Sequence, residues 1–204
     1  MERTIDLTKT VNYVINVDSD TSRLSEVTQV LDTLEMPFIR FSADTTPSPP
    51  NPYGKHLIAC SKSHLSLLKK MKPPTLVFED DIVPTKNFSK TLSIPEDADA
   101  VYLGVSTYGT VRNNYFGYPG VVMTTQETET MKRVYNMCGA HAVLYLSQEY
   151  IDAAISIVEN YIERQVIVDV ALPHIHKDFK ILTPNDPFFY QKDQATATNL
   201  SLKI

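Results

Sequence analysis

One short segment, residues 75–81 (TLVFEDD), restricts the fold more than any other part of the chain. Residues 75–78 are apolar and β-prone, and they are followed at once by Glu79, Asp80 and Asp81. Side chains alternate along a strand, so we expect a buried strand with Glu79 and Asp81 on one side and Asp80 on the other. In open α/β sheets, ligands bind beyond the carboxyl ends of the strands, which is where these acids would lie.

The three neighbouring acids need a partner, because like charges this close raise one another's pKa unless a cation neutralises them. A set of oxygen ligands suits Mg²⁺ or Mn²⁺ better than a thiolate-seeking metal. The sequence therefore predicts a divalent-cation site at Glu79, Asp80 and Asp81. The alternative is a solvated turn before Pro84, whose acids cap the next segment.

The composition is that of a globular protein. The chain has 204 residues, 43% of them hydrophobic and 21% charged, which suits one domain with a substantial core. A net charge of −5 argues against a broad nucleic-acid-binding face. No apolar run reaches the roughly 18 residues of a membrane span, and the first residues lack the pattern of a secretory signal, so we expect a cytoplasmic protein. Cys60 and Cys138 are expected to be free thiols.

Hydrophobic periodicity predicts alternating strands and helices through the first half of the chain. Strands are expected at residues 11–17, 38–41, 75–79, 100–104, 121–125, 140–146 and 179–182. Helices are expected from residue 21 or 22 to residue 34, at 57–72 and, capped by Ser147, at 148–162. This alternation favours a mostly parallel central sheet flanked by helices, with residues 11–17 at its centre and residues 100–104 as a parallel neighbour of residues 75–79.

Two segments are predicted to be loops. Residues 42–52 are rich in proline and serine, and residues 106–120 gather glycines and tyrosines without periodicity. Long loops in compact domains often carry function, so we expect residues 106–120 to order over a bound ligand, with Arg112 as a probe of that closure.

Several segments, taken in order, resemble the motifs of glycosyltransferase family 25, which includes lipopolysaccharide-type and procollagen galactosyltransferase-like enzymes. The similar segments are residues 14–18 with Arg23, 38–44, 59–64, 76–83, 99–104, 139–147 and 168–169. The sharpest resemblance is Ser63-His64 followed by Glu79-Asp80-Asp81 at the family's distance. The chain departs from the family at Ala59, where a glycine is usual, and after Asp44.

This resemblance implies a GT-A-like nucleotide-sugar-binding fold in a single domain. Residues 1–104 would bind the nucleotide sugar and the metal, and residues 105–204 would face the acceptor. It also implies a UDP-sugar donor of a hexose such as galactose or glucose, with Mn²⁺ or Mg²⁺ on the acids. The acceptor would be a glycan, a lipopolysaccharide or a protein.

Five further residues are candidates for holding the donor. Asn16 and Asp18 resemble base-recognition positions, although turn chemistry explains them equally well. The guanidinium fork of Arg23 suits uridine or pyrophosphate oxygens, and the alternative is a surface charge on a helix. Ser63 and His64 are expected at a helix start, where N–H groups favour phosphate; the alternative for His64 is a packed core histidine. Glu79 and Asp80 are candidates for donor contacts as well as for the metal.

The second half of the chain offers three more candidates. His174 and His176 can supply a nitrogen ligand to the metal, a weak signal by itself. Asp169 follows an apolar run and is the candidate general base that deprotonates the acceptor hydroxyl in an inverting displacement. Its alternative role is the N-cap of a helix.

Three classes of function remain open from the sequence. The first is a metal-dependent glycosyltransferase, and the second is a nucleotide-sugar- or carbohydrate-binding relative without turnover. The third, a metal-dependent phosphohydrolase, would need Asp18 as its nucleophile and lacks a phosphate-binding glycine loop.

Overall fold

The computed structural model of the protein describes residues 1–46, 57–111 and 117–192. Its strands are β1 (Glu2–Asp6), β2 (Val11–Asn16), β3 (Ile39–Ser42), β4 (Thr75–Glu79), β5 (Ile82–Pro84), β6 (Thr91–Pro95), β7 (Ala100–Tyr102), β8 (Tyr108–Thr110), β9 (Gly117–Pro119), β10 (Thr124–Gln126), β11 (Met131–Val134), β12 (Ala142–Tyr145), β13 (Ile181–Pro184) and β14 (Phe189–Gln191). Its helices are α1 (Thr21–Thr33), α2 (Leu57–Leu68), α3 (Gln148–Glu163) and α4 (Val168–Ala171), followed by the 3-10 turns η1 (Leu172–His174) and η2 (His176–Asp178).

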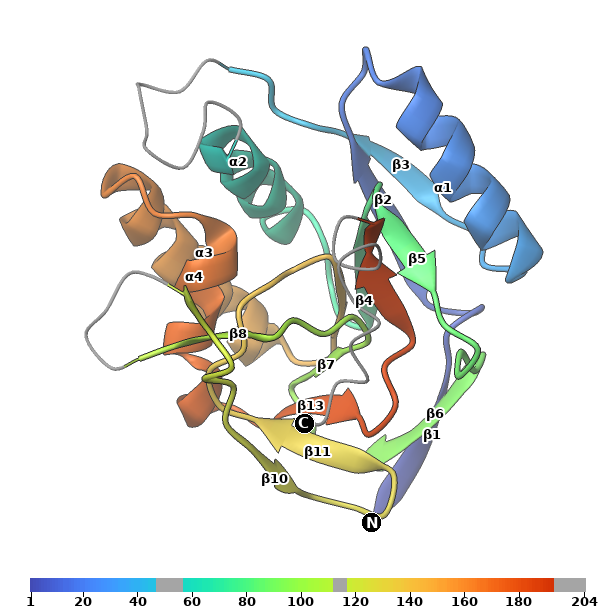
Figure 1. The fold of residues 1–204 in the computed structure, drawn as a ribbon, viewed down its shortest axis with the longest axis vertical. Coiled ribbons are helices and arrows are strands. Elements are labelled where there is room, and N and C mark those ends of the chain that lie inside the picture. The colour runs from blue at the N-terminus through green and yellow to red at the C-terminus, as the bar shows by residue number, and fades with distance from the viewer. Residues whose placement is uncertain (47–56, 112–116, 193–204) are drawn as a thin grey trace.

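A large mixed sheet organises the described part of the chain, with strand order β10-β11-β13-β7-β12-β4-β2-β3 (Figure 1). β2 is parallel to both β3 and β4, and β7 is parallel to β13. The other neighbours in this sheet are antiparallel. Three two-stranded sheets, β1-β6, β14-β5 and β8-β9, complete the described strands.

The expectation of a mostly parallel sheet is therefore wrong, although the α/β class is correct. β12 lies between β4 and β7 and runs antiparallel to both, so β7 is not a direct parallel neighbour of β4. β2 was expected at the centre, but it lies next to the edge strand β3. Strands buried on both faces have similar apolar sequences whichever way they run, so the local pattern cannot give their direction.

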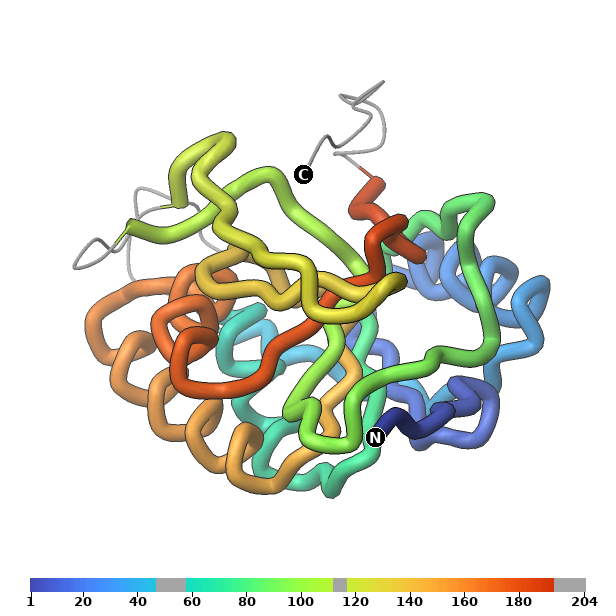
Figure 2. The backbone as a smooth tube through the Cα atoms, turned by 90° about the horizontal axis from the view of Figure 1, so that it is seen from below, coloured from blue at the N-terminus to red at the C-terminus, as the bar shows by residue number. Residues whose placement is uncertain are grey.

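The central strands are buried on both faces, and their side chains alternate between two hydrophobic layers. Val77 of β4, Val143 of β12 and Tyr102 of β7 face the layer that packs against α2, α3 and α4. Leu76 and Phe78 of β4 face the opposite layer, which contains residues of α1 and β6. Figures 1 and 2 show the same arrangement, with α1 apart from the group of α2, α3 and α4.

Three local features differ from the sequence-based expectations. Asp20, rather than residue 21 or 22, is the N-cap of α1, because its side chain accepts a hydrogen bond from the N–H of Arg23. The segment 106–120 was expected to be a loop, but its described residues include the antiparallel strands β8 and β9. Arg112, the intended probe of loop closure, lies outside the described residues, as do residues 47–52 of the other expected loop.

This topology places the carboxyl ends of β2 and β4 side by side, since the two strands are adjacent and parallel. The chain turns through Asp80 and Asp81 directly after β4 and continues into β5, which pairs with β14. The N-terminus of α1 follows β2 after a short turn. The acids of the TLVFEDD segment therefore lie at a strand edge surrounded by several elements.

Candidate functional site

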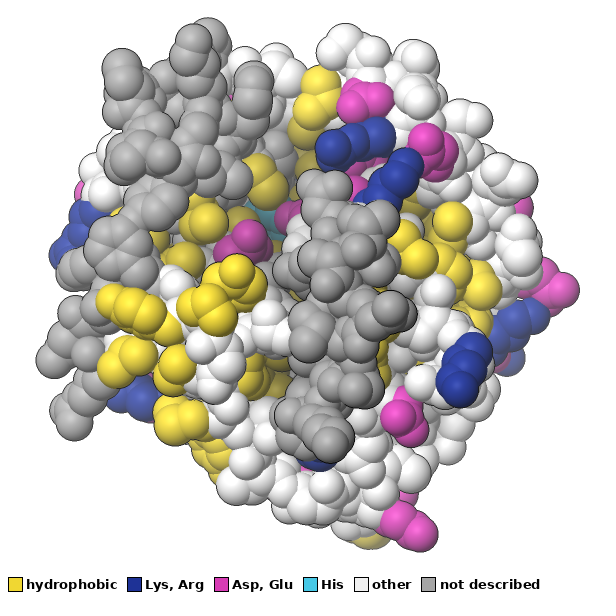
Figure 3. All heavy atoms as spheres, in the orientation of Figure 1, with side chains coloured by type: hydrophobic (Ala, Val, Ile, Leu, Met, Phe, Trp, Pro, Cys, Tyr) yellow, Lys and Arg dark blue, Asp and Glu magenta, His cyan; other side chains and the backbone are white. Residues whose placement is uncertain are grey.

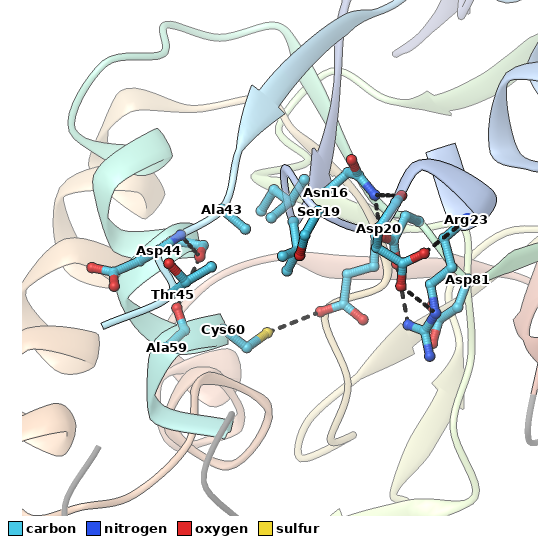
Figure 4. A pocket seen from close by; sticks show the side chains of 15 residues that line it. Asn16, Ser19, Asp20, Arg23, Ala43, Asp44, Thr45, Ala59, Cys60 and Asp81 are labelled. Atoms are coloured by element: carbon cyan, nitrogen blue, oxygen red, sulfur yellow. Dashed lines mark hydrogen bonds and ion pairs between the residues drawn. The ribbon is translucent and has the colours of Figure 1, made fainter. Parts of the chain in front are cut away.

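A pocket of about 580 Å³ opens at this strand edge. It is lined by Ile15, Asn16, Val17, Ser19, Asp20, Arg23, Ala43, Asp44, Thr45, Ala59, Cys60, Ser63, Glu79, Asp80 and Asp81. Figure 4 shows these side chains, and the space-filling view in Figure 3 shows acidic side chains and a histidine at the bottom of a hollow. The volume falls within the usual range for small-molecule sites, which is roughly 300–1,000 Å³.

Asp80 is held by two residues from the neighbouring strand and helix. Its Oδ2 accepts a 2.7 Å hydrogen bond from Nδ2 of Asn16, at the end of β2. Its Oδ1 is 3.3 Å from Nη1 of Arg23, on the first turn of α1. The structure thus brings together three residues that the sequence singled out. About half of the Arg23 side chain is exposed, so part of its guanidinium still faces solvent.

Asp81 lies beside this network without a full set of partners. Its Oδ1 is buried and accepts no hydrogen bond. Burial, together with the charges of Glu79 and Asp80, raises the pKa of Asp81 to about 7. A buried carboxylate oxygen with no partner suits a cation ligand, because its desolvation is otherwise uncompensated.

Glu79 points to the other side of the strand end and contacts α2. Its Oε1 is 2.9 Å from Nε2 of His64 and 3.6 Å from Sγ of Cys60. Its Oε2 accepts a 3.1 Å hydrogen bond from Nε2 of Gln191. Burial opposes ionisation of Glu79, but the contact with His64 outweighs it and lowers the pKa. Glu79 is therefore a carboxylate at neutral pH.

Ser63 and His64 were expected at the start of a helix, but α2 begins at Leu57, so both lie in its middle. Their N–H groups are therefore not at the positive end of the helix, and that reason for a phosphate contact is lost. Ser63 Oγ instead donates to the carbonyl of Ala59 and accepts from the N–H of Asp44. Ser63 lines the pocket, whereas the His64 side chain is only 1% exposed.

Asp18 lies just outside the residues that line the pocket. Its carboxylate pairs with Arg40 and accepts a 2.7 Å hydrogen bond from Ser42, both on β3. Arg40 also donates from Nε to Oδ1 of Asn16 at 3.0 Å. Asp18 is thus linked to the pocket through Arg40 and Asn16, while Asp20 lines it directly.

Asp169 lies in the first turn of the short helix α4, not at the end of a strand. It is also not the N-cap, which is Ile167. Its Oδ1 is buried without a hydrogen-bond partner, and burial with the charge of Glu79 raises the pKa of Asp169 to about 7. The N–H of Val168 donates to Oγ of Ser61, which ties α4 to α2. Asp169, on α4, therefore interacts electrostatically with Glu79 and Asp81 at the end of β4.

His174 and His176 do not line the pocket. His176 is fully buried, and its Nε2 is 2.9 Å from the hydroxyl of Tyr102. The ring of His174 packs 5.3 Å from the ring of Tyr161 on α3. The structure thus surrounds both histidines with aromatic core residues rather than with the acids after β4.

Three residues near Glu79 were missed by the sequence analysis. Cys60 was interpreted only as a free thiol, although its four-residue spacing from His64 places both on one face of a helix. His141 precedes β12, and its carbonyl accepts a 3.0 Å hydrogen bond from the N–H of Glu79. Gln191 comes from β14, which no sequence signal predicted.

The described residues contain no helix long and apolar enough to cross a membrane. No curated protein sequence matches the chain. Among solved structures, the chain is similar to CTP:phosphocholine cytidylyltransferase from Streptococcus pneumoniae, with 9% sequence identity and a TM-score of 0.40. That alignment covers 92% of this chain and 97% of the cytidylyltransferase.

The fold is α/β, and its pocket lies beyond the carboxyl ends of β2 and β4, which is where α/β proteins usually bind their ligands. Residues 9–154 match the family model described as "Glycosyltransferase family 25 (LPS biosynthesis protein)". This match covers more than half of the chain, and the chain therefore belongs to glycosyltransferase family 25. It is accordingly a transferase that uses a sugar donor, as the resemblance of its motifs implied.

Proposed function

We propose that the protein transfers a hexose from a UDP-sugar to an acceptor hydroxyl, with inversion at the sugar carbon, in a GT-A-like arrangement assisted by Mn²⁺ or Mg²⁺. The observation that carries the proposal is the pocket at the end of β2 and β4, where Asn16, Arg23, Asp80 and Asp81 converge. A glycan, a lipopolysaccharide or a protein would accept the sugar, on the side of the second half of the chain.

Arg23 and Asn16 are suited to hold the donor. The Arg23 side chain is half exposed at the pocket, so its remaining N–H groups can donate to pyrophosphate or uridine oxygens. Asn16 Nδ2 already donates to Asp80 and to the carbonyl of Asp20, and it fixes the end of β2. Arg23 would therefore contact the donor, while Asn16 would keep Asp80 and the end of β2 in place beside it.

Asp81 and Asp80 are the residues that would hold the divalent ion. The unpartnered, buried Oδ1 of Asp81 fits a cation, and a carboxylate oxygen of Asp80 keeps a lone pair beyond each hydrogen bond. Such an ion neutralises the charge that develops on a diphosphate leaving group. Glu79 is already engaged by His64 and Gln191, so we assign the ion to the two aspartates.

Asp169 is the proposed general base. A base is most effective when its pKa is near the operating pH, and the pKa of Asp169 is about 7. Asp169 lies on α4, whereas Asp80 and Asp81 follow β4. It therefore remains available to take a proton when Asp80 and Asp81 hold the ion and the diphosphate. Asp169 is not among the residues that line the pocket, but its Oδ1 makes no hydrogen bond and is therefore left to accept the proton of an acceptor hydroxyl.

Calorimetry with UDP and Mn²⁺ tests the donor site. Asp81→Asn should weaken Mn²⁺-dependent UDP binding about tenfold or more, because a charged ligand is lost. The matched control is Asp97→Asn, which alters an exposed aspartate that pairs with Lys180 outside the pocket. Equal UDP affinity with and without EDTA would contradict the metal-assisted donor site.

Turnover with a panel of nucleotide sugars tests the base. Asp169→Asn should lower turnover by roughly 10²-fold while UDP and Mn²⁺ affinities stay nearly unchanged, as expected for a general base. Near-normal turnover of Asp169→Asn would remove it from the mechanism. In the same panel, binding without UDP release would identify a catalytically silent nucleotide-sugar-binding protein, and inorganic phosphate would identify a phosphohydrolase.

A further inference from the structure

A group of side chains at the inner end of the pocket combines three kinds of metal-binding atom. Sγ of Cys60, a ring nitrogen of His64 and a carboxylate oxygen of Glu79 all lie within 4.8 Å of one another. Cys60 and His64 are four residues apart on α2, so they project from the same face of the helix. Glu79 reaches them from the end of β4. We refer to these three residues as the thiol cluster.

We propose that the thiol cluster binds a thiolate-preferring divalent cation of the zinc class, at a position separate from the oxygen ligands of Asp80 and Asp81. Sulfur, imidazole nitrogen and carboxylate oxygen together form a donor set typical of Zn²⁺ rather than of Mg²⁺ or Mn²⁺. Three protein ligands leave a fourth position for water or a small ligand.

The cluster has both an entrance and supporting contacts. Cys60 and Glu79 line the pocket, so an ion can reach them from solvent. The imidazole of His64 is already oriented by its 2.9 Å contact with Glu79. Gln191 donates to the second carboxylate oxygen of Glu79, and such outer hydrogen bonds fix the orientation of a metal ligand. Only modest side-chain movement is needed to place the three atoms around one ion.

An independent observation is that polar groups buried around the cluster lack partners. His141 is 1% exposed, and neither of its ring nitrogens makes a hydrogen bond. It is hydrogen-bonded through its backbone to Glu79 across an antiparallel ladder, which puts the two side chains on one face of the sheet. Oδ1 of Asp169 is also buried without a partner, and its charge acts on the Cys60 thiol. A cation at the cluster would compensate this buried negative charge.

Binding at the cluster exchanges a proton for the ion. The Cys60 thiol releases its proton to solvent and the thiolate forms the bond to the metal. The proton on Nε2 of His64, which faces Glu79, moves to Nδ1, so that the neutral imidazole coordinates through Nε2. No oxidation or reduction is involved. The inference goes beyond the proposed sugar transfer and does not rest on it, because no donor or acceptor takes part.

Titration of the full chain with Co²⁺, followed by absorption spectroscopy, tests the inference. Co²⁺ substitutes for Zn²⁺, and a cobalt–thiolate bond gives a charge-transfer band in the near ultraviolet. We expect this band to saturate at one equivalent, to disappear on addition of Zn²⁺ and to persist with Mg²⁺. Cys60→Ser should abolish it, whereas Cys138→Ser, which changes the second of the two cysteines, should leave it intact.

Two further variants separate this position from the donor site. Asp81→Asn should retain the band. His64→Ala should weaken Co²⁺ binding at least tenfold, because even the loss of a residue that only orients a metal ligand typically lowers metal affinity about 10–100-fold. In the unaltered protein, Zn²⁺ should also slow alkylation of Cys60 but not of Cys138, as mass spectrometry would show. Absence of the band in the unaltered protein, its survival in Cys60→Ser or its loss in Cys138→Ser would each overturn the inference.

Discussion

Adding a single methyl group at Gly104 should lower the stability of the folded protein markedly. It follows β7, and its N–H donates to the carbonyl of Ala142 in the neighbouring strand. A Cβ atom at Gly104 would lie 2.1 Å from Nε2 and 2.3 Å from Cδ2 of His141. These separations are more than 1 Å shorter than an ordinary contact of about 3.5 Å between such atoms.

The imidazole has little room to escape this overlap, because His141 is 1% exposed and lies between the buried strands β7 and β4. Overpacking of this kind typically costs about 1–3 kcal/mol. We expect Gly104→Ala to cost about 2–3 kcal/mol, since the clash involves a whole ring rather than one flexible end. For a chain of this size, that corresponds to a melting temperature lower by roughly 4–12 °C.

Urea unfolding and thermal unfolding of Gly104→Ala would measure this cost. The control is Gly117→Ala, where the added Cβ would meet one atom at 3.1 Å and the next at 3.6 Å, so a cost below about 1 kcal/mol is expected. In a His141→Ala background the ring is gone, and Gly104→Ala should then cost less than about 0.5 kcal/mol. An unchanged melting temperature, or the same penalty in both backgrounds, would refute the steric argument.

Three further predictions concern stability. The pKa of Asp169 is raised to about 7 from the usual 3.8, so the folded state binds more protons between these values and stability falls as pH rises from about 4 to about 7. In EDTA, Asp169→Asn should reduce this slope, with Asp81, whose pKa is also raised to about 7, accounting for the remainder; an unchanged slope in urea titrations would contradict the prediction. Ser147→Ala removes the side-chain cap of α3 and should cost about 1 kcal/mol, whereas Gln148→Ala on the same turn should cost far less. Phe189→Ala empties a fully buried position against Phe78 and should cost about 3–5 kcal/mol; a cost below about 1 kcal/mol would show that β14 contributes little to the core.

The sequence predicted β2, β4 and α3 well because each carries a local signal. β4 is an apolar run, α3 has a serine cap followed by helical periodicity, and β2 is β-branched and apolar. Strand order carries no such signal. β12 is as apolar as β4 and β7, so nothing in its sequence shows that it inserts antiparallel between them.

The candidate site was predictable where chemistry is concentrated in one segment and hidden where it depends on tertiary contacts. The acids after β4 stand together in the sequence, but strand alternation grouped Glu79 with Asp81. β4 ends at Glu79, and Glu79 contacts His64 apart from Asp80 and its partner Asn16. The contact of Cys60 with Glu79 could not be predicted, because it forms only when α2 packs against the end of β4. Gln191 lies 112 residues from Glu79, whose carboxylate it contacts. Hydrophobic periodicity placed the helix start at residue 57, as in α2, whereas the expectation of a helix start at Ser63 and His64 was wrong.

The pairing of β14 with β5 has a consequence for synthesis of the chain. Gln191 holds Glu79, and the N–H of Lys192 donates to the carbonyl of Asp81 at 2.8 Å. A ribosome that has released residues 9–154, the range matched by the family model, has produced the acids and their partners Asn16, Arg23 and His64, but not β14. The pocket thus closes by contacts of long sequence separation, which form slowly because the intervening chain must first be ordered. Until residue 192 emerges, Glu79 of the nascent protein lacks its contact with Gln191, and Asp81 lacks its contact with Lys192.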